Sequence, residues 1–141
     1  YVHTVRNLEH FFVNTNVFWV DVQLKKNIPA LIDYIDVAII PYNTDLDFNK
    51  LCYPMKLMEY FYLGKPVVST PIQELIRHQP LVRIGSNATE FRQHVRHVLI
   101  GGWPKELRKW QRRLAIDNSW EKKIEAISTL LEQHPRFQGV G

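Results

Sequence analysis

Short apolar runs alternate along this chain with longer segments in which apolar residues recur at helical spacing. The runs lie at residues 16–22, 36–42, 66–70 and 81–85, with helical or polar segments between them. This alternation is typical of an α/β domain, in which helices connect the strands of a parallel sheet. We therefore predict a parallel sheet with flanking helices, in which the run at 36–42 is a fully buried strand.

Helical spacing also predicts which side chains turn inward. Asn87, with Glu90 three residues later, resembles a capping box, and Gly64 suits the end of a helix that Pro54 begins. The segment 72–77 is predicted to be a further short helix. The expected apolar faces are Ile28, Leu31, Ile32 and Ile35; Phe91, Val95 and Leu99; Leu107, Trp110 and Leu114; and Trp120, Ile124, Ile127 and Leu131.

Composition limits the class of protein. Of the 141 residues, 45% are hydrophobic and 23% charged, which is the balance of one soluble domain with its own core. No apolar run approaches the roughly 20 residues of a membrane span. The single cysteine, Cys52, excludes an internal disulfide and favours a reducing cytoplasm, and no Cys and His cluster predicts a metal site. The net charge of +4 suits phosphates, an anionic membrane surface or no special partner.

The two ends of the chain bear on its domain organisation. The sequence starts at Tyr1 rather than Met and enters structured-looking sequence at once, so we expect a fragment of a longer polypeptide. Residues 1–133 are expected to form the domain. Residues 134–141 show no periodicity and are expected to form a flexible tail.

The segment 43–53 is the predicted site of chemistry, because it is polar and follows the strand at 36–42. Ligands of open α/β sheets bind outside the carboxyl ends of the strands, and a helix N-terminus offers anions free amides and a positive dipole end. Lys56 adds a charge in the first turn of the next helix. Glu59 follows among apolar residues, where a carboxylate needs partners such as the two hydroxyls of a ribose. The alternative is a solvated Lys56 to Glu59 ion pair of little energetic weight.

A longer pattern carries a family resemblance. The sequence IDVAIIPY, then a polar loop, then YPMKLMEYFYLGKPVVSTPI, resembles the C-terminal, nucleotide-sugar-binding half of a GT-B glycosyltransferase of the group 1 type, in its Pro-x-Lys-x-x-Glu-Tyr variant. The resemblance covers residues 16–133. It implies a Rossmann-like domain with extra C-terminal helices. It also implies sugar transfer from a UDP or GDP type of donor to a glycan or lipid-linked acceptor, with retention of configuration and without a metal.

The resemblance implies roles for individual residues. Glu59 matches the second glutamate of the family's Glu-x7-Glu motif and would bind the ribose hydroxyls. Tyr53 and Met55 would approach the diphosphate and the base, and Lys56 would approach a phosphate oxygen. Tyr42, at the end of the preceding strand, is counted with these donor-binding residues. No catalytic residue is identified.

Two positions depart from the family pattern. Leu51 stands where the first glutamate would face the donor sugar, and Pro54 stands where many members have a glycine and therefore offers no amide. Asn49 or Lys50 could take over the sugar contacts. The family's first strand, loop and helix of this domain, and its N-terminal acceptor domain, are not seen before Tyr1. We expect the isolated chain to bind donor weakly and to transfer nothing.

Other features leave alternatives open. Two groups of basic residues are expected to be solvated faces. The alternative for both is contact with phosphates or an anionic membrane surface, and for the second group also contact with nucleic acid. The first group is Arg92, His94, Arg96 and His97, and the second is Lys105, Arg108, Lys109, Arg112 and Arg113 beside Trp103 and Trp110. A cytoplasmic protein at the inner face of the membrane, without a nucleic-acid partner, fits the resemblance. A nucleotide-sugar epimerase of GT-B architecture and a noncatalytic α/β module share much of the pattern.

Overall fold

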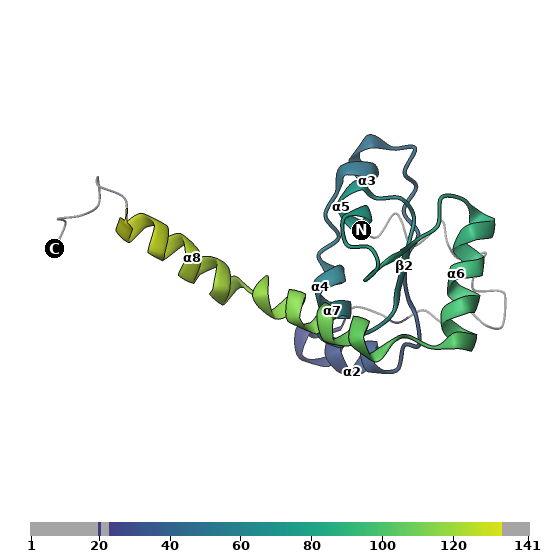
Figure 1. Cartoon of the computed structure of the whole chain (residues 1–141), viewed down its shortest axis with the longest axis horizontal. Coiled ribbons are helices and arrows are strands. Elements are labelled where there is room, and N and C mark those ends of the chain that lie inside the picture. Colours follow the sequence, from purple (N-terminus) through teal and green to yellow (C-terminus); the bar gives the residue numbers. More distant parts are fainter. Residues whose placement is uncertain (1–19, 21–22, 134–141) are drawn as a thin grey trace.

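The computed structural model describes residue 20 and residues 23–133. Within them the chain forms an α/β layer structure around a parallel sheet in the order β1-β2-β3, as the alternation predicts. Figure 1 shows α6 on one side of the sheet and α4 with α7 on the other. The predicted strand at 16–22 lies almost wholly outside the described residues, as does the tail. The strands are β1 (Ala38–Ile40), β2 (Val67–Ser69) and β3 (Arg83–Ile84), and the helices are η2 (Lys25–Asn27), α2 (Ile28–Asp33), α3 (Asp47–Leu51), α4 (Lys56–Tyr62), α5 (Gln73–Ile76), α6 (Ala88–Gly101), α7 (Lys105–Asp117) and α8 (Trp120–Gln133).

The core lies between the sheet and helices α4, α5 and α7. All three residues of β2 are buried, as expected for a central strand. In β1, Ala38 and Ile40 are buried but Ile39, which points to the other face, is 47% exposed. The prediction of a fully buried strand is therefore wrong for β1, where alternate side chains face different environments. Fully buried side chains of the main cluster are Ile40, Leu57, Phe61, Val67, Ile72, Leu75 and Val82.

Helix α4 starts later than predicted and ends as predicted. It begins at Lys56 rather than Pro54, and the preceding segment, expected to be a loop throughout, contains the short helix α3. At its end Gly64 has a φ of +63°, and the Lys65 amide donates to the Tyr60 carbonyl at 2.9 Å. This bond runs from the amide of the sixth residue of the turn to the carbonyl of the first. It is typical of a Schellman motif, in which glycine is favoured at the position with positive φ.

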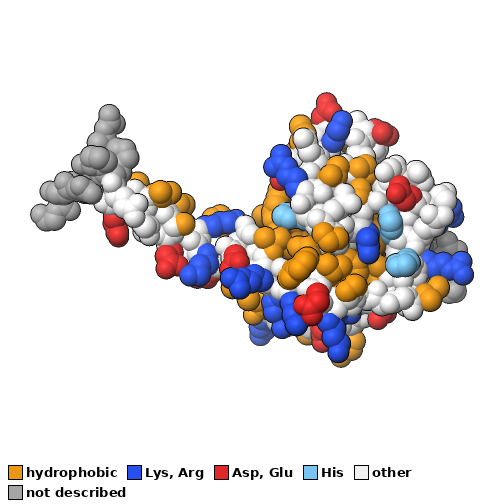
Figure 2. Space-filling model, viewed as in Figure 1, with side chains coloured by type: hydrophobic (Ala, Val, Ile, Leu, Met, Phe, Trp, Pro, Cys, Tyr) orange, Lys and Arg blue, Asp and Glu red, His pale blue; other side chains and the backbone are white. Residues whose placement is uncertain are grey.

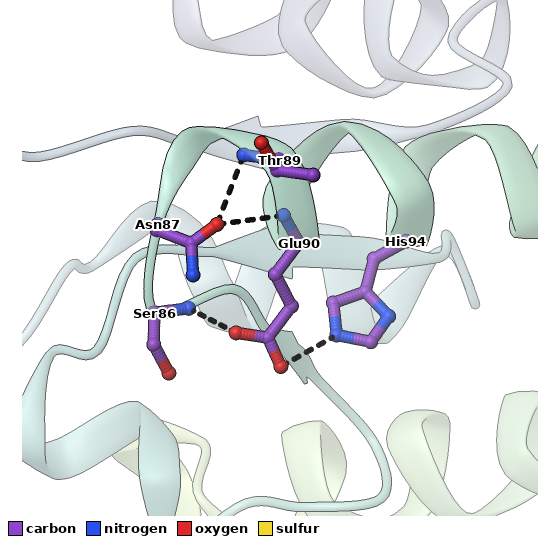
Figure 3. Close-up of polar contacts among 5 residues, drawn as sticks. All are labelled: Ser86, Asn87, Thr89, Glu90 and His94. Atoms are coloured by element: carbon purple, nitrogen blue, oxygen red, sulfur yellow. Dashed lines mark hydrogen bonds and ion pairs between the residues drawn. The ribbon is translucent and has the colours of Figure 1, made fainter.

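Helix α6 begins at the predicted cap. Figure 3 shows the Asn87 Oδ1 atom accepting from the amides of Thr89 and Glu90, both at 3.0 Å. The Glu90 carboxylate accepts from the Ser86 amide at 2.8 Å, one residue before the position that a capping box uses. Further along, Val98 is buried and the predicted Leu99 is 57% exposed. In the last turn of α6 the buried position is therefore Val98, one residue before the predicted one.

Helix α7 packs against α4 through a buried polar residue. Gln111 is fully buried and donates to the carbonyls of Lys65 and Leu81 at 3.0 and 2.9 Å. Its side-chain oxygen accepts from the Trp103 indole at 3.1 Å. Leu107 is buried as predicted, but Trp110 is 58% exposed, so the expectation of a core tryptophan is wrong. The three bonds of Gln111 satisfy its buried amide, on the face of α7 that also buries Leu107 and Ala115.

Helix α8 extends away from the rest of the described chain (Figure 1). Hydrophobic side chains lie along it in Figure 2, and every residue of the helix is exposed. The predicted stripe therefore exists, but the expected packing of it is not present within the described residues. Its side chains are Trp120, Ile124, Ile127 and Leu131, at 77, 59, 56 and 48% exposure.

Candidate functional site at the carboxyl edge of the sheet

Two hydroxyl residues at the end of β2 fix the chain as it leaves β1. The Thr70 hydroxyl donates to the Tyr42 carbonyl at 2.8 Å, and the Ser69 hydroxyl donates to the Ile40 carbonyl at 3.1 Å. The Thr70 amide also donates to the Ile40 carbonyl at 3.2 Å. Sequence reasoning missed this contribution, although Ser and Thr side by side at a strand end are residues that commonly bond backbone groups. The result is a fixed position for Tyr42.

The Tyr42 ring and the Lys56 ammonium meet at this edge. The Lys56 ammonium lies 5.0 Å from the centroid of the Tyr42 ring, which is the range of a cation–π contact. Lys56 is half-buried, and desolvation lowers its pKa, an effect that nearby Cys52 opposes. The neighbouring Tyr60 has a raised pKa, first through burial and then through Glu59 and Tyr42.

Lys56 has no carboxylate partner among the described residues. The ion pairs there include neither Lys56 nor Glu59, so the exposed pair that formed the alternative interpretation is not made. A half-buried ammonium without an anion beside it costs free energy, because the aromatic contact replaces only part of its hydration. An anionic ligand would offset that cost.

Glu59 lies on the open side of α4. The helix buries Leu57 and Phe61 and leaves Glu59 and Tyr62 exposed, although Glu59 stands among apolar residues in the sequence. Glu59 remains one turn from Lys56 on the same helix. Its carboxylate is thus free to accept hydrogen bonds from a ligand that approaches from solvent.

The loop before α4 is held by its own polar side chains. The Asp45 amide donates to Asn43 Oδ1 at 3.0 Å, and the Asn49 side-chain amide donates to the Asn43 carbonyl at 2.9 Å. The Cys52 thiol donates to the Asn49 carbonyl at 3.1 Å. Asn49, a predicted ligand contact, is therefore a structural bridge of the loop that keeps its side-chain oxygen available.

The remaining predicted residues, Tyr53 and Met55, are exposed to solvent. Tyr53 is 44% and Met55 83% exposed, and burial of part of the Tyr53 ring, followed by nearby Glu74, raises its pKa. Leu51, which stands at the departure from the family pattern, is 62% exposed in α3. The described residues contain no group of three or more His, Cys, Asp or Glu side chains that could hold a metal ion.

The basic run of α7 is largely engaged within the fold. Arg112 Nε donates to the Tyr62 carbonyl at 3.1 Å, and Arg108 Nη1 donates to the Gly64 carbonyl at 3.4 Å. These cations lie at the carboxyl end of α4, where they satisfy free carbonyls and favour the helix dipole. Lys109 pairs with Glu106 and Arg113 with Asp117.

The comparisons with known proteins give one similarity. Over 109 residues, 74% of this chain, it is 28% identical to the "Putative teichuronic acid biosynthesis glycosyltransferase TuaH" of Bacillus subtilis (strain 168). The chain spans about a quarter of that protein, since the match covers 27% of its length. No family model and no solved structure matches the chain.

Proposed function

We propose that this chain is part of a glycosyltransferase and binds a nucleotide diphosphate sugar at the carboxyl edge of β1 and β2. The fold is the C-terminal, donor-binding half of a GT-B enzyme of the group 1 type. Three features support the proposal: the small parallel sheet with flanking helices, the similarity to a glycosyltransferase, and the Pro54 to Tyr60 motif at the expected edge.

Lys56 is the observation on which the proposal depends most. It is a half-buried cation that lies over Tyr42 and has no carboxylate within ion-pair distance in the described part of the chain. A diphosphate supplies the missing anion, and a point charge on a flexible stem is a common phosphate ligand. In transfer, Lys56 would stabilise the negative charge that develops on the departing diphosphate, so that no metal is needed.

Glu59 is assigned to the ribose. Its exposed carboxylate can accept from both hydroxyls, while Tyr53 and Met55, which are also exposed, would approach the diphosphate and the base. The Asn49 side chain uses its nitrogen within the loop, so its oxygen could accept from the donor sugar. It would replace the family's first glutamate, whose position is taken by Leu51. The enzyme is proposed to retain configuration at the transferred carbon.

The whole enzyme is proposed to contain an N-terminal acceptor domain. Leu46, Phe48 and Met55 form an apolar rim beside the site, at 57, 84 and 83% exposure, which a facing domain would cover. The acceptor would be a glycan or lipid-linked sugar at the cytoplasmic face of a membrane. No helix in the described part of the chain is long and apolar enough to span one.

Calorimetric titration of UDP, GDP and their sugar conjugates tests this function. One nucleotide should bind the wild-type chain, and Lys56→Met should weaken it about 10- to 100-fold, since hydrogen bonds to charged groups contribute about 1.5–3 kcal/mol. Glu59→Ala should weaken the binding of nucleotides that carry a ribose but leave the binding of inorganic pyrophosphate unchanged. Lys109→Met, an exposed control, should bind as wild type does. Equal binding by Lys56→Met and wild type would refute the assignment, and product analysis of the full enzyme separates transfer from epimerisation.

A further inference from the structure

A second candidate site lies at the opposite edge of the sheet from Lys56. A hollow of about 260 Å³ opens where α6 ends and α7 begins, and Arg83, His97, Gly102 and Trp103 line it. Arg83 is the first residue of β3, and α6 starts beyond the carboxyl end of β3 and runs back to the amino edge. We call this feature the α6 hollow. Its residues take no part in the proposed donor site.

Arg83 is held in place on an aromatic wall. Its guanidinium carbon lies 5.7 Å from the centroid of the Trp103 ring. Trp103 is itself fixed, because it is buried and its indole donates to Gln111 at 3.1 Å. A guanidinium stacked in this way keeps its planar fork of donors free along the edge, which suits the oxygens of a phosphate.

Two arginines, Arg83 and Arg96, lie at or beside the α6 hollow. His97 forms a wall shared with a neighbouring depression of about 390 Å³, which Arg96 and Ile100 also line. No ion pair in the described chain includes Arg83, Arg96 or His97. The negative end of the α6 dipole and the positive end of the α7 dipole, next to Pro104, oppose each other here, so the side chains determine the sign.

We propose that the α6 hollow binds the phosphate group of a small anionic ligand, held between Arg83 and His97. The volume fits a small group, since sites for drug-sized ligands begin at about 300 Å³. Ile100, on the last turn of α6, is 76% exposed and lines the neighbouring depression. It gives a lipid phosphate an apolar surface to lie against, so the phosphate is either that of a lipid head group or that of a soluble ester.

The test is a titration of the isotope-labelled 141-residue chain with glycerol 3-phosphate, followed by NMR, with glycerol as the neutral control. The Gly101 and Gly102 amides and the Trp103 indole should shift saturably. Arg83→Gln and His97→Gln should each weaken binding, the former about tenfold or more. Arg92→Gln, which removes a charge from α6 away from the hollow, should change nothing. His97 is exposed, so its variant gives an answer even if the loss of Arg83 disturbs the fold.

Flotation with phosphatidylglycerol vesicles, and with phosphatidylcholine vesicles as a control, separates the two sources. Binding to the anionic vesicles alone that is lost in His97→Gln and Arg83→Gln supports a lipid phosphate. Saturable binding of glycerol 3-phosphate without flotation supports a soluble one. The proposal is wrong if neither ligand binds, or if Arg92→Gln weakens binding as much as Arg83→Gln does.

Discussion

Gly85 lies where the end of β3 meets the first turn of α6. A Cβ atom there would stand 2.6 Å from both the Cα and the amide nitrogen of Phe91, which are backbone atoms that cannot rotate away. Gly85→Ala should therefore lower the free energy of unfolding by about 1–3 kcal/mol, the usual cost of overpacking. Gly101→Ala is the matched control, because its Cβ would meet no atom closer than 3.9 Å. Equal stability of both variants in urea would contradict this account.

Lys56 should reduce stability while it serves binding. Burial lowers its pKa, so the folded chain holds this proton less tightly than the unfolded chain does. The resulting cost is complete below the folded pKa and disappears as the pH rises toward the ordinary lysine value.

Lys56→Met should accordingly raise the melting temperature at neutral pH while it weakens nucleotide binding. Below the folded pKa the difference from wild type should stay constant, and it should shrink in the alkaline range. Thermal unfolding across that range checks this, with Lys109→Met as the exposed control. A melting temperature below that of wild type at neutral pH would show that the ring contact outweighs the loss of hydration.

Local signals at single residues were predictable. Asn87 and Gly64 act through neighbouring backbone groups, so their types and spacing determined the caps before any tertiary contact was known. Gln111 was not predictable, because two of its three partners are the carbonyls of Lys65 and Leu81, which are 46 and 30 residues away in sequence.

At the scale of elements, Gln111 joins α7 to the turn after α4 and to the segment before β3. Gln111→Met preserves most of the volume but leaves two carbonyls and an indole N–H without partners. Since each unsatisfied buried group costs about 1–3 kcal/mol, the variant should lose at least about 2 kcal/mol of stability. Gln93→Met on the exposed side of α6 should be close to neutral in the same urea titration. A small effect in Gln111→Met would mean that water reaches these groups.

Helix α8 should behave as a separate element. It has 14 residues, all exposed, and isolated helices of about this length are marginal in water. Its amides should exchange with deuterium far faster than those of β2 in dilute solution. Protection of α8 that equals the protection of β2 would instead mean that another surface covers the Trp120 stripe.

Periodicity predicted which elements are helices better than which sides they bury. Trp110 and Leu99 fit their stripes by type, yet both are exposed, while Gln111 and Val98 occupy the inward positions. A stripe of residue types covers about 100° of a helix, so a neighbouring residue can replace one of its members when a specific contact favours it.

At the scale of the whole molecule, the edge of the sheet that holds the candidate site followed from the order of strands and helices. The meeting of Tyr42 with Lys56 could not be predicted, because it depends on the path of the 43–53 loop and on bonds from Ser69 and Thr70. The exposure of Glu59 could not be predicted either, because the apolar residues beside it in the sequence do not show which side of the helix packs against the core.

A nucleotide diphosphate is expected to bind at the carboxyl edge of the sheet, beside Lys56 and Glu59. A crystal structure of this chain with the nucleotide selected by calorimetry would test it directly. We expect a phosphate oxygen within hydrogen-bond distance of the Lys56 ammonium, about 3 Å, and ribose hydroxyls that donate to the Glu59 carboxylate. A nucleotide bound at another edge, with Lys56 still over Tyr42 and no phosphate near it, would contradict the claim.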